Sequence, residues 1–236
     1  MDKAIYVALS GAVLQERRME VLTDNLANVN TAGYKGQKPL FEASLSDEFR
    51  IRSFGRLTDV STDHTQGILQ QTGKKLDFAI RGDGFFAVET PNGKGYTRDG
   101  SFVAGVNGEI LTREGHKVLG VDGPLKLSST DIKVDALGRL SAGGAAVGAL
   151  KLATFNDLSV LRREGGVYRA LPGSQEQPVS PNTQVEQGYV ETSNVNAVKA
   201  MTTMIEALRS YETHSKMIQS IDDQTRKAVE EVGRTS

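Results

Sequence analysis

The sequence contains neither cysteine nor tryptophan. Without cysteine the chain forms no disulfide, no thiolate metal site and no thiol nucleophile, a composition that also suits an oxidising compartment. Histidine is scarce too: His64, His116 and His214 fall in three separate segments, without the spacing of metal ligands. The composition therefore argues against metal and thiol chemistry.

The chain also lacks an excess of charge of either sign. Its 236 residues carry a formal net charge of −1, and the lysines and arginines are scattered without interleaved aromatic residues. Nucleic-acid-binding faces concentrate basic residues, so no nucleic-acid partner is predicted. No apolar run approaches the roughly 20 residues of a membrane span, so no membrane insertion is predicted either.

What the chain does have is an apolar stripe at each end. The first stripe, in residues 2–29, has its members alternately three and four apart: Ile5, Ala8, Ala12, Gln15, Met19, Leu22, Leu26 and Val29. This is the spacing of the core positions of a coiled coil. It predicts a helix roughly 40 Å long that needs a partner, because an isolated helix of this kind is marginal in water. Gly33 suits the left-handed position after the helix end.

The second stripe, in residues 195–232, predicts a partner helix. Its members recur at near-helical spacing: Val195, Val198, Met201, Ile205, Leu208, Tyr211, Ile218, Ile221, Thr225, Val229 and Val232. Ser193 and Asn194, or Asn196, are candidates to cap its start. Periodicity alone leaves open whether the two helices serve assembly or simply pack on the core of a monomer.

Between the stripes the pattern changes to β. Residues 34–75 predict an extended connecting arm, in which Leu40 to Phe54 is either a short helix or extended. Residues 76–188 predict a β-rich domain of short strands and turns, a sandwich or partly closed barrel, with a short helical turn at Asn156 to Leu161. The fold class is therefore α+β: an N-terminal helix (1–33) pairs in coiled-coil fashion with a C-terminal helix (189–236), and the two flank a mainly antiparallel β domain.

Candidate chemistry is sparse. Residues 82–87 match a dinucleotide-binding string, but the pattern after them is strand and turn, whereas that motif needs a helix. Gly82 and Gly84 therefore indicate a tight turn. Asp77, Asp83 and Asp99 lie beside glycines or in turns, where acids usually bind backbone. The alternative, an enzyme that cleaves glycosidic bonds, needs two carboxylates roughly 5–9.5 Å apart. No catalytic residue, cofactor or metal site is predicted.

Three motifs carry a resemblance. Ala8–Gly11 and Asp24–Lys35 resemble the opening motif of the flagellar rod and hook protein family. Leu76–Phe86 and Tyr96–Phe102 resemble its shared β-domain. The closing motif is similar to the residues Gly188–Asn196, Met204–Ile205 and Arg209–Glu212. The chain lacks the large insert of hook proteins and is short for a distal rod subunit. The resemblance therefore favours a proximal rod subunit, with a distal one as the alternative.

This resemblance implies a structural subunit and not an enzyme. Such subunits assemble with copies of themselves and with other rod proteins into a helical tube in the periplasmic part of the basal body. The tube transmits torque and passes exported subunits. The flagellar type III export apparatus is the expected route, without a cleaved signal peptide, since the apolar residues after Lys3 continue in helical phase past Gln15–Arg18.

The resemblance and the two stripes together predict an assembly interface on the terminal helices, whose ends are expected to become ordered on assembly. Asn25 and Asn28 are expected to hydrogen-bond backbone at the end of the first helix. The predicted interface residues are Ile5, Met19, Leu22, Leu26, Asn25, Asn28, Val198, Met201, Ile205 and Leu208. The rival hypothesis is a monomeric adhesin or tail-like binding module, which would bury both helices in its own core.

Overall fold

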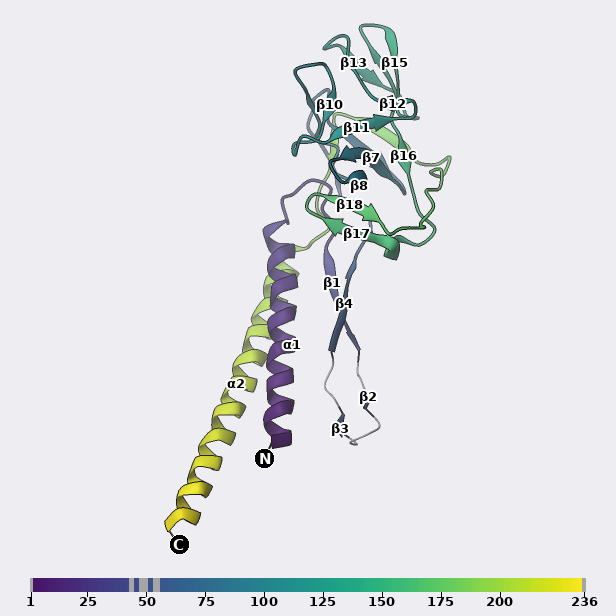
Figure 1. The fold of residues 1–236 in the computed structure, drawn as a ribbon. Coiled ribbons are helices and arrows are strands. Elements are labelled where there is room, and N and C mark those ends of the chain that lie inside the picture. Colours follow the sequence, from purple (N-terminus) through teal and green to yellow (C-terminus); the bar gives the residue numbers. More distant parts are fainter. Residues whose placement is uncertain (1, 43–44, 47–50, 53–55, 235–236) are drawn as a thin grey trace. The chain divides into compact units, whose positions relative to one another are not determined.

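The structure, a computed structural model, describes residues 2–42, 45–46, 51–52 and 56–234, and the chain divides into two compact units (Figure 1). Unit 1 comprises Met1–Ala27, Gln37–Asp63 and Val195–Ser236. Unit 2 comprises Asn28–Gly36 and His64–Asn194, all of which are described. The chain therefore crosses between the units at four points.

Unit 1 contains two long helices and short strands. These elements are α1 (Asp2–Ala27), β1 (Gln37–Glu42), β2 (Leu45–Ser46), β3 (Ile51–Arg52), β4 (Arg56–Thr62) and α2 (Ala197–Arg234). Strands β1 and β4 pair antiparallel, with an irregularity in register between Leu40 and Phe41, and β2 pairs with β3. The described parts of 40–54 are thus strands; residues 43–44, 47–50 and 53–54 lie outside the described residues.

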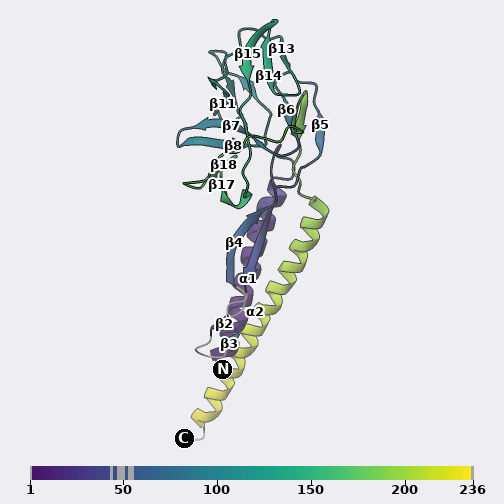
Figure 2. The same ribbon diagram turned by 90° about the vertical axis from the view of Figure 1, so that its right-hand side faces the viewer.

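The two helices lie where the apolar stripes predicted them. Neither contains proline, and both contain several alanines, the residue that favours helix most. The Asn196 side chain accepts a hydrogen bond from the Lys199 N–H at 2.9 Å, which confirms one of the predicted caps. The helices pack side by side in opposite directions, as Figures 1 and 2 both show.

Unit 2 is a mainly antiparallel β-domain, as predicted. Its strands are β5 (Leu69–Gln71), β6 (Phe78–Arg81), β7 (Phe85–Thr90), β8 (Gly93–Thr97), β9 (Val103–Ala104), β10 (Ile110–Leu111), β11 (Lys117–Gly120), β12 (Gly123–Pro124), β13 (Ile132–Val134), β14 (Arg139–Ala142), β15 (Ala145–Ala149), β16 (Leu152–Ala153), β17 (Leu161–Glu164), β18 (Val167–Ala170), β19 (Gln184–Gln187) and β20 (Tyr189–Glu191). A 3₁₀ turn, Leu158–Val160, confirms the short helical turn predicted there.

Most strands of unit 2 belong to one large sheet, in which β7 is central. Within this fully described unit the sheet has nine strands, seven of them in the order β17-β18-β8-β7-β11-β10-β9, with β12 on β11 and β16 on β7. Three strands form a second sheet, β13-β14-β15, and β19-β6 and β20-β5 are separate pairs. The hairpin predicted at Pro91–Gly93 joins β7 to β8, with Thr90 opposite Gly93.

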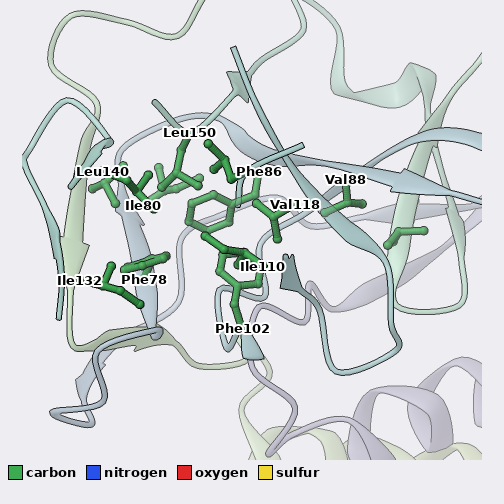
Figure 3. Close-up of a cluster of buried hydrophobic side chains, with 13 residues drawn as sticks. Phe78, Ile80, Phe86, Val88, Phe102, Ile110, Val118, Ile132, Leu140 and Leu150 are labelled. Carbon is green, nitrogen blue, oxygen red and sulfur yellow. The ribbon is translucent and has the colours of Figure 1, made fainter. Parts of the chain in front are cut away.

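The core lies on both faces of β7. Phe86 and Val88 point into the larger cluster, together with Phe78, Ile110 and Val118 (Figure 3). The alternate residues of β7, Phe85 and Ala87, belong to a second cluster on the opposite face. Because both faces are covered, the first four residues of the strand are all buried, which explains its continuous apolar run. The remaining members of the larger cluster are Ile80, Phe102, Leu125, Ile132, Leu140, Leu150, Val167 and Val185.

Candidate functional site

Small side chains form the contact between α1 and α2. Ala8 and Ala207 are completely buried, and Ala12 and Ala200 nearly so. Gly11 lies against the imidazole of His214, where a Cβ on residue 11 would come within 2.5 Å of the ring. A contact of this kind brings two backbones close together, but it buries little apolar area. At about 25 cal/mol per Å², alanines contribute far less than leucines would.

Four large apolar residues in the first part of α2 are exposed instead. Val198 is 72% exposed, Met201 49%, Ile205 52% and Leu208 47%. Their alternating spacing of three and four places them along one face of the helix. We call these four residues the α2 stripe. Ala200 and Ala207 of the same helix are buried, so the α2 stripe is not the buried side of this part of the helix.

The predicted residues of α1 have a different environment. Ile5, Met19, Leu22 and Leu26 are all partly buried. Exposed apolar residues of α1 lie elsewhere: Tyr6 is 71% exposed, Leu9 47% and Val13 46%. We call these three residues the α1 stripe. Sequence reasoning missed it, although its members are also spaced three and four apart, one residue away from Ile5, Ala8 and Ala12.

At the end of α1, the Asn25 side chain binds backbone as predicted, whereas the Asn28 side chain binds a hydroxyl. The Asn25 side chain is buried; its amide donates to the Gln37 carbonyl and its oxygen accepts from the Gln37 N–H, both at 2.7 Å. Asn25 thus joins the last turn of α1 to the start of β1. The Asn28 carbonyl accepts from the Thr31 N–H at 3.1 Å, and its side chain accepts from the Thr31 hydroxyl. Both contacts fix the backbone where the helix ends.

Two polar atoms near the helix contact are buried without a hydrogen-bond partner among the described residues. They are Gln15 Oε1 and His214 Nδ1. Charged groups of the pair lie outside: Arg17 contacts Glu20 at 2.7 Å, and Arg226 contacts Asp222 and Asp223. The contact between the helices therefore contains two buried polar atoms without hydrogen-bond partners among the described residues. The outer faces of the helices carry the two apolar stripes and the charged residues.

Unit 2 contains a cavity of about 430 Å³ beside the loop at residues 30–34. Its acidic lining residues are Asp99 and Glu114. Asp99 accepts hydrogen bonds from the N–H and the hydroxyl of Ser101, the turn-forming role predicted for it, and Glu114 lies 3.5 Å from His116. In the described part of the chain no three acidic or histidine side chains gather as a metal site. No described helix has the length and apolarity to cross a membrane.

Turn geometry accounts for the glycines of the dinucleotide-like string. Gly82 and Gly84 adopt φ of 103° and 131° between β6 and β7, in the left-handed half of the map that favours glycine. A strand follows them, so the string has no helix N-terminus with which to bind a pyrophosphate. The arrangement that remains as a functional candidate is the helix pair with its two exposed stripes.

Comparison with known proteins matches three family models along the chain. Residues 5–35 match the family described as flagella basal body rod protein. Residues 79–147 match the flagellar hook protein FlgE/F/G D1 domain, and residues 186–231 match the flagellar basal body rod FlgEFG protein C-terminal family. The order of the three matches follows the order of the three sequence motifs.

Individual relatives align over nearly the whole chain. The flagellar basal-body rod protein FlgF of Caulobacter vibrioides is 34% identical, with 99% of each chain covered. FlgF of Escherichia coli is 35% identical, with 97% of each chain covered. The flagellar basal-body rod protein FlgG of Buchnera aphidicola subsp. Baizongia pistaciae is 34% identical, over 96% of this chain and 98% of its own.

Proposed function

The chain belongs to the family of flagellar basal-body rod proteins, and we propose that it is a structural subunit that packs against copies of itself and other rod proteins through its two helices. The observation that supports this interface is the exposure of the α1 and α2 stripes. Contiguous apolar surface on a soluble protein marks an interaction site. Each large side chain in such a stripe gains roughly 1.5–3 kcal/mol when a neighbour buries it.

The two stripes are different surfaces, so we propose that they support a heterologous contact. A contact between unlike surfaces generates an open helical filament when its rotation does not close a ring. This is the geometry that a rod requires. In that arrangement the subunit acts mechanically: the tube transmits torque, and its channel passes exported subunits. The predicted residues of α1, which are partly buried in the single chain, contribute to the same interface at their exposed edges.

Within the family we propose the proximal rod as the position of this subunit. Relatives named FlgF align over 97% or more of both chains. Relatives named FlgG align with similar identity but over longer alignments, with 96% of this chain covered. The distal rod subunit is therefore the alternative within the family.

Deletion of the gene, followed by electron microscopy of purified basal bodies, tests both proposals. A proximal subunit predicts basal bodies without rod from its base upward. A distal subunit predicts a short stub of rod. Complete basal bodies with a normal rod in the deletion strain would contradict a structural role in the rod. Re-expression of the unaltered gene from a plasmid is the control.

The rival candidate is a monomeric adhesin or tail-like module. Such a protein buries its apolar helix faces in its own core, whereas here two stripes are exposed. Sedimentation of the purified chain across a wide concentration range distinguishes the two. A subunit is expected to self-associate as concentration rises, and a chain that stays monomeric and is absent from basal bodies would favour the module.

Export through the type III apparatus without signal cleavage is also part of the proposal. It is supported by family membership and by α1, which carries the apolar residues after Lys3 as one continuous helix. Mass spectrometry of the subunit recovered from purified basal bodies provides the test. Detection of peptides that begin at Met1 or Asp2 is expected. A mature N-terminus further along α1 would contradict it.

A further inference from the structure

Three charged side chains meet in the interior of unit 2. Lys35 is completely buried, Glu191 is 1% exposed and Arg98 is 4% exposed. The Lys35 Nζ donates to Glu191 Oε1 at 2.5 Å, and an Arg98 guanidinium nitrogen donates to Glu191 Oε2 at 3.2 Å. Both oxygens of one carboxylate are therefore engaged by cations in a site without solvent.

Backbone groups supply further hydrogen bonds to this cluster, in which the Arg98 Nε is the atom left without a partner among the described residues. The Lys35 Nζ also donates to the Thr65 carbonyl at 2.7 Å, and Arg98 donates to the Gly82 carbonyl at 2.8 Å. The Gly67 N–H donates to Glu191 Oε1 at 2.7 Å. Burial of charge is costly unless the groups are paired and further hydrogen bonds satisfy them. Glu191 meets this condition by joining groups from three separate parts of the chain.

Asn194, three residues later, joins the same segments. Its side-chain oxygen accepts from the Gly36 N–H at 2.8 Å, and its amide donates to the Thr65 carbonyl at 3.0 Å. Backbone bonds run alongside: the Gly33 N–H donates to the Glu191 carbonyl at 2.7 Å. The segments at residues 33–36, 65–67 and 191–194 are thus bound to one another by both side chains.

These segments are the ones through which the chain leaves unit 2. Residues 28–36 connect α1 to β1. Unit 2 resumes at residue 64, after the part of unit 1 that contains β4, and ends at residue 194, before the part that contains α2. All four crossing points between the units therefore adjoin this cluster in sequence. Force that travels along the chain from one unit to the other passes through these segments.

We propose that Glu191 and Asn194 are positioning residues that hold the three connecting segments on the β-domain as a single cooperative clasp. Release of residues 191–194 leaves Lys35 and Arg98 without their carboxylate, release of residues 33–36 removes one of the two cations from Glu191, and release of residues 65–67 breaks two hydrogen bonds to the charged groups. Each release therefore weakens the hold on the other segments, so the segments detach together. A rod subunit needs such a junction, because a helix connection that yields separately would dissipate torque. The clasp itself follows from the contacts in unit 2 and does not depend on the assignment to the rod.

Hydrogen exchange of the full-length chain, resolved to single amides, tests the clasp in the variant Glu191→Gln. Glutamine keeps the size of the side chain but loses the charge. Its NH₂ group, a hydrogen-bond donor, would face the N–H donors of Arg98. A hydrogen bond to a charged group is worth more than about tenfold in an equilibrium constant. We expect exchange to accelerate about tenfold or more at Gly67, Gly33 and Gly36 together, while the amides of β7 keep their protection.

Two further variants make the result decisive. Asn194→Ala removes no charge, and we expect it to accelerate the Gly67 amide, which Asn194 does not bind, as well as Gly36. Glu186→Gln is the matched control: Glu186 lies on β19 and forms an ion pair with the exposed Arg81, so the amides of Gly67, Gly33 and Gly36 should not change. Acceleration confined to the amide that each side chain binds directly would overturn the clasp. Equal acceleration throughout unit 2, including β7, would also overturn it, since it would mean general destabilisation. If Glu191→Gln fails to fold, Asn194→Ala alone decides by the same criteria.

Discussion

At the scale of single residues, Gly33 has two reasons to be glycine. Its φ is 67°, which confirms the left-handed conformation predicted after the first helix, although the helix itself ends earlier, at Ala27. A Cβ on residue 33 would also lie 2.1 Å from the backbone nitrogen of Asp99. The left-handed conformation was predictable from the motif, whereas the approach to Asp99 depends on a contact that sequence does not reveal.

Gly33→Ala is therefore expected to destabilise unit 2 strongly. The left-handed conformation alone costs a non-glycine residue about 1–2 kcal/mol, and the clash with a rigid backbone atom adds to that cost. Gly73→Ala is the matched control, because Gly73 has a φ of 71° but no atom near its missing Cβ. We expect urea unfolding to show about 1 kcal/mol of destabilisation for the control and at least twice that for Gly33→Ala. Equal effects would mean that the contact with Asp99 is unimportant.

The Glu176 carboxylate is expected to make the stability of unit 2 depend on pH. Burial acts to raise the pKa of Glu176, but hydrogen bonds from Lys94, Tyr96 and Lys151 outweigh it and lower the pKa from 4.5 to about 2. Since the folded-state pKa is depressed, the stabilisation is complete above about pH 4.5 and disappears as the pH falls through about 2. The partial exposure of the carboxylate reduces this contribution, through solvent screening, to about 1 kcal/mol.

Glu176→Gln should therefore lower the free energy of unfolding at neutral pH by about that amount and flatten its decline between pH 4.5 and 2. Denaturant unfolding at a series of pH values measures both effects. Glu164→Gln, which removes an ion pair with Arg169 on the surface of the same unit, is the control. An unchanged acid slope in Glu176→Gln would contradict the role of this carboxylate.

At the scale of elements, the apolar stripes predicted both helices and the buried side of α1, but not the facing of the first part of α2. A stripe with a spacing of three and four identifies a helix, and both helices were found. The same stripe does not say what covers it. In α2 the large residues Met201 and Ile205 face outward while Ala200 and Ala207 are buried. Periodicity favours the largest residues as the contact, whereas in this part of α2 the fully buried residues are the small ones, which allow close approach.

The strands were predictable to different degrees for physical reasons. Strand β7 and its hairpin with β8 could be predicted from a short apolar run and a Pro-Asn-Gly turn, which are local signals. Strands β1 and β4 pair across a long intervening stretch of sequence, and pairings of this kind leave no local pattern. The cluster around Glu191 is likewise non-local, since Lys35 and Glu191 lie far apart in the chain.

The contact of small residues predicts that Ala207→Leu separates the helices. Ala207 has no exposed surface, so added methylenes force a shift that typically costs 1–3 kcal/mol. Leu208→Ala, its neighbour on the exposed side, should change the stability of the free subunit by about 0.5 kcal/mol or less. Thermal unfolding followed by far-UV circular dichroism compares the two. A larger loss in Leu208→Ala than in Ala207→Leu would show that the helix facing is reversed.

The α2 stripe predicts a separation of folding from assembly. The double variant Met201→Gln with Ile205→Gln keeps good helix formers at exposed positions, so the free subunit should retain its helix content. Incorporation into basal bodies should fall at least tenfold, because the neighbour no longer buries two large apolar side chains. Immunoblots of purified basal bodies and swimming assays measure this.

The neighbouring exposed residue Glu206 supplies the control for the stripe. Glu206→Gln changes a polar residue beside the stripe and should incorporate normally. Normal incorporation of the double variant would remove the α2 stripe from the assembly interface. Loss of helix content in the double variant, with the control unaffected, would mean that the stripe is already covered in the free subunit.

At the scale of the whole molecule, the two units have different sources of stability. Unit 2 has a large apolar core on both faces of β7 and the buried cluster around Glu191. The helices of unit 1 have few fully buried residues, mostly small ones, and leave the α1 and α2 stripes exposed. We therefore expect unit 2 to contribute most of the stability of the free subunit, and the proposed neighbours to complete the burial of the helices. This division of stability suits a subunit whose terminal helices gain their full order on assembly.

The last turns of α2 extend beyond the start of α1 (Figures 1 and 2). Gly11 lies against His214, and Asp2 lies nine residues before Gly11, so in this antiparallel pair the first residue of α1 is level with Asp223. Residues 224–234 thus continue as helix beyond the described start of α1. A short helical segment that packs on no other helix is marginal in water. We expect trypsin to cleave dilute free subunit first at Arg226 and Lys227, and more slowly at Lys199 and Arg209, which lie in the paired part of the same helix.

In assembled rods we expect cleavage at the helix end to slow, because in the proposed interface a neighbouring subunit packs against that end. Mass spectrometry of fragments at successive times follows each site in free subunit and in purified basal bodies. We expect protection at Arg226 and Lys227 to increase at least about tenfold on assembly, which corresponds to about 1.4 kcal/mol of local opening. If the helix end already resists trypsin in dilute subunit, then it is ordered before assembly. The rod interface would then have to be sought on the stripes alone.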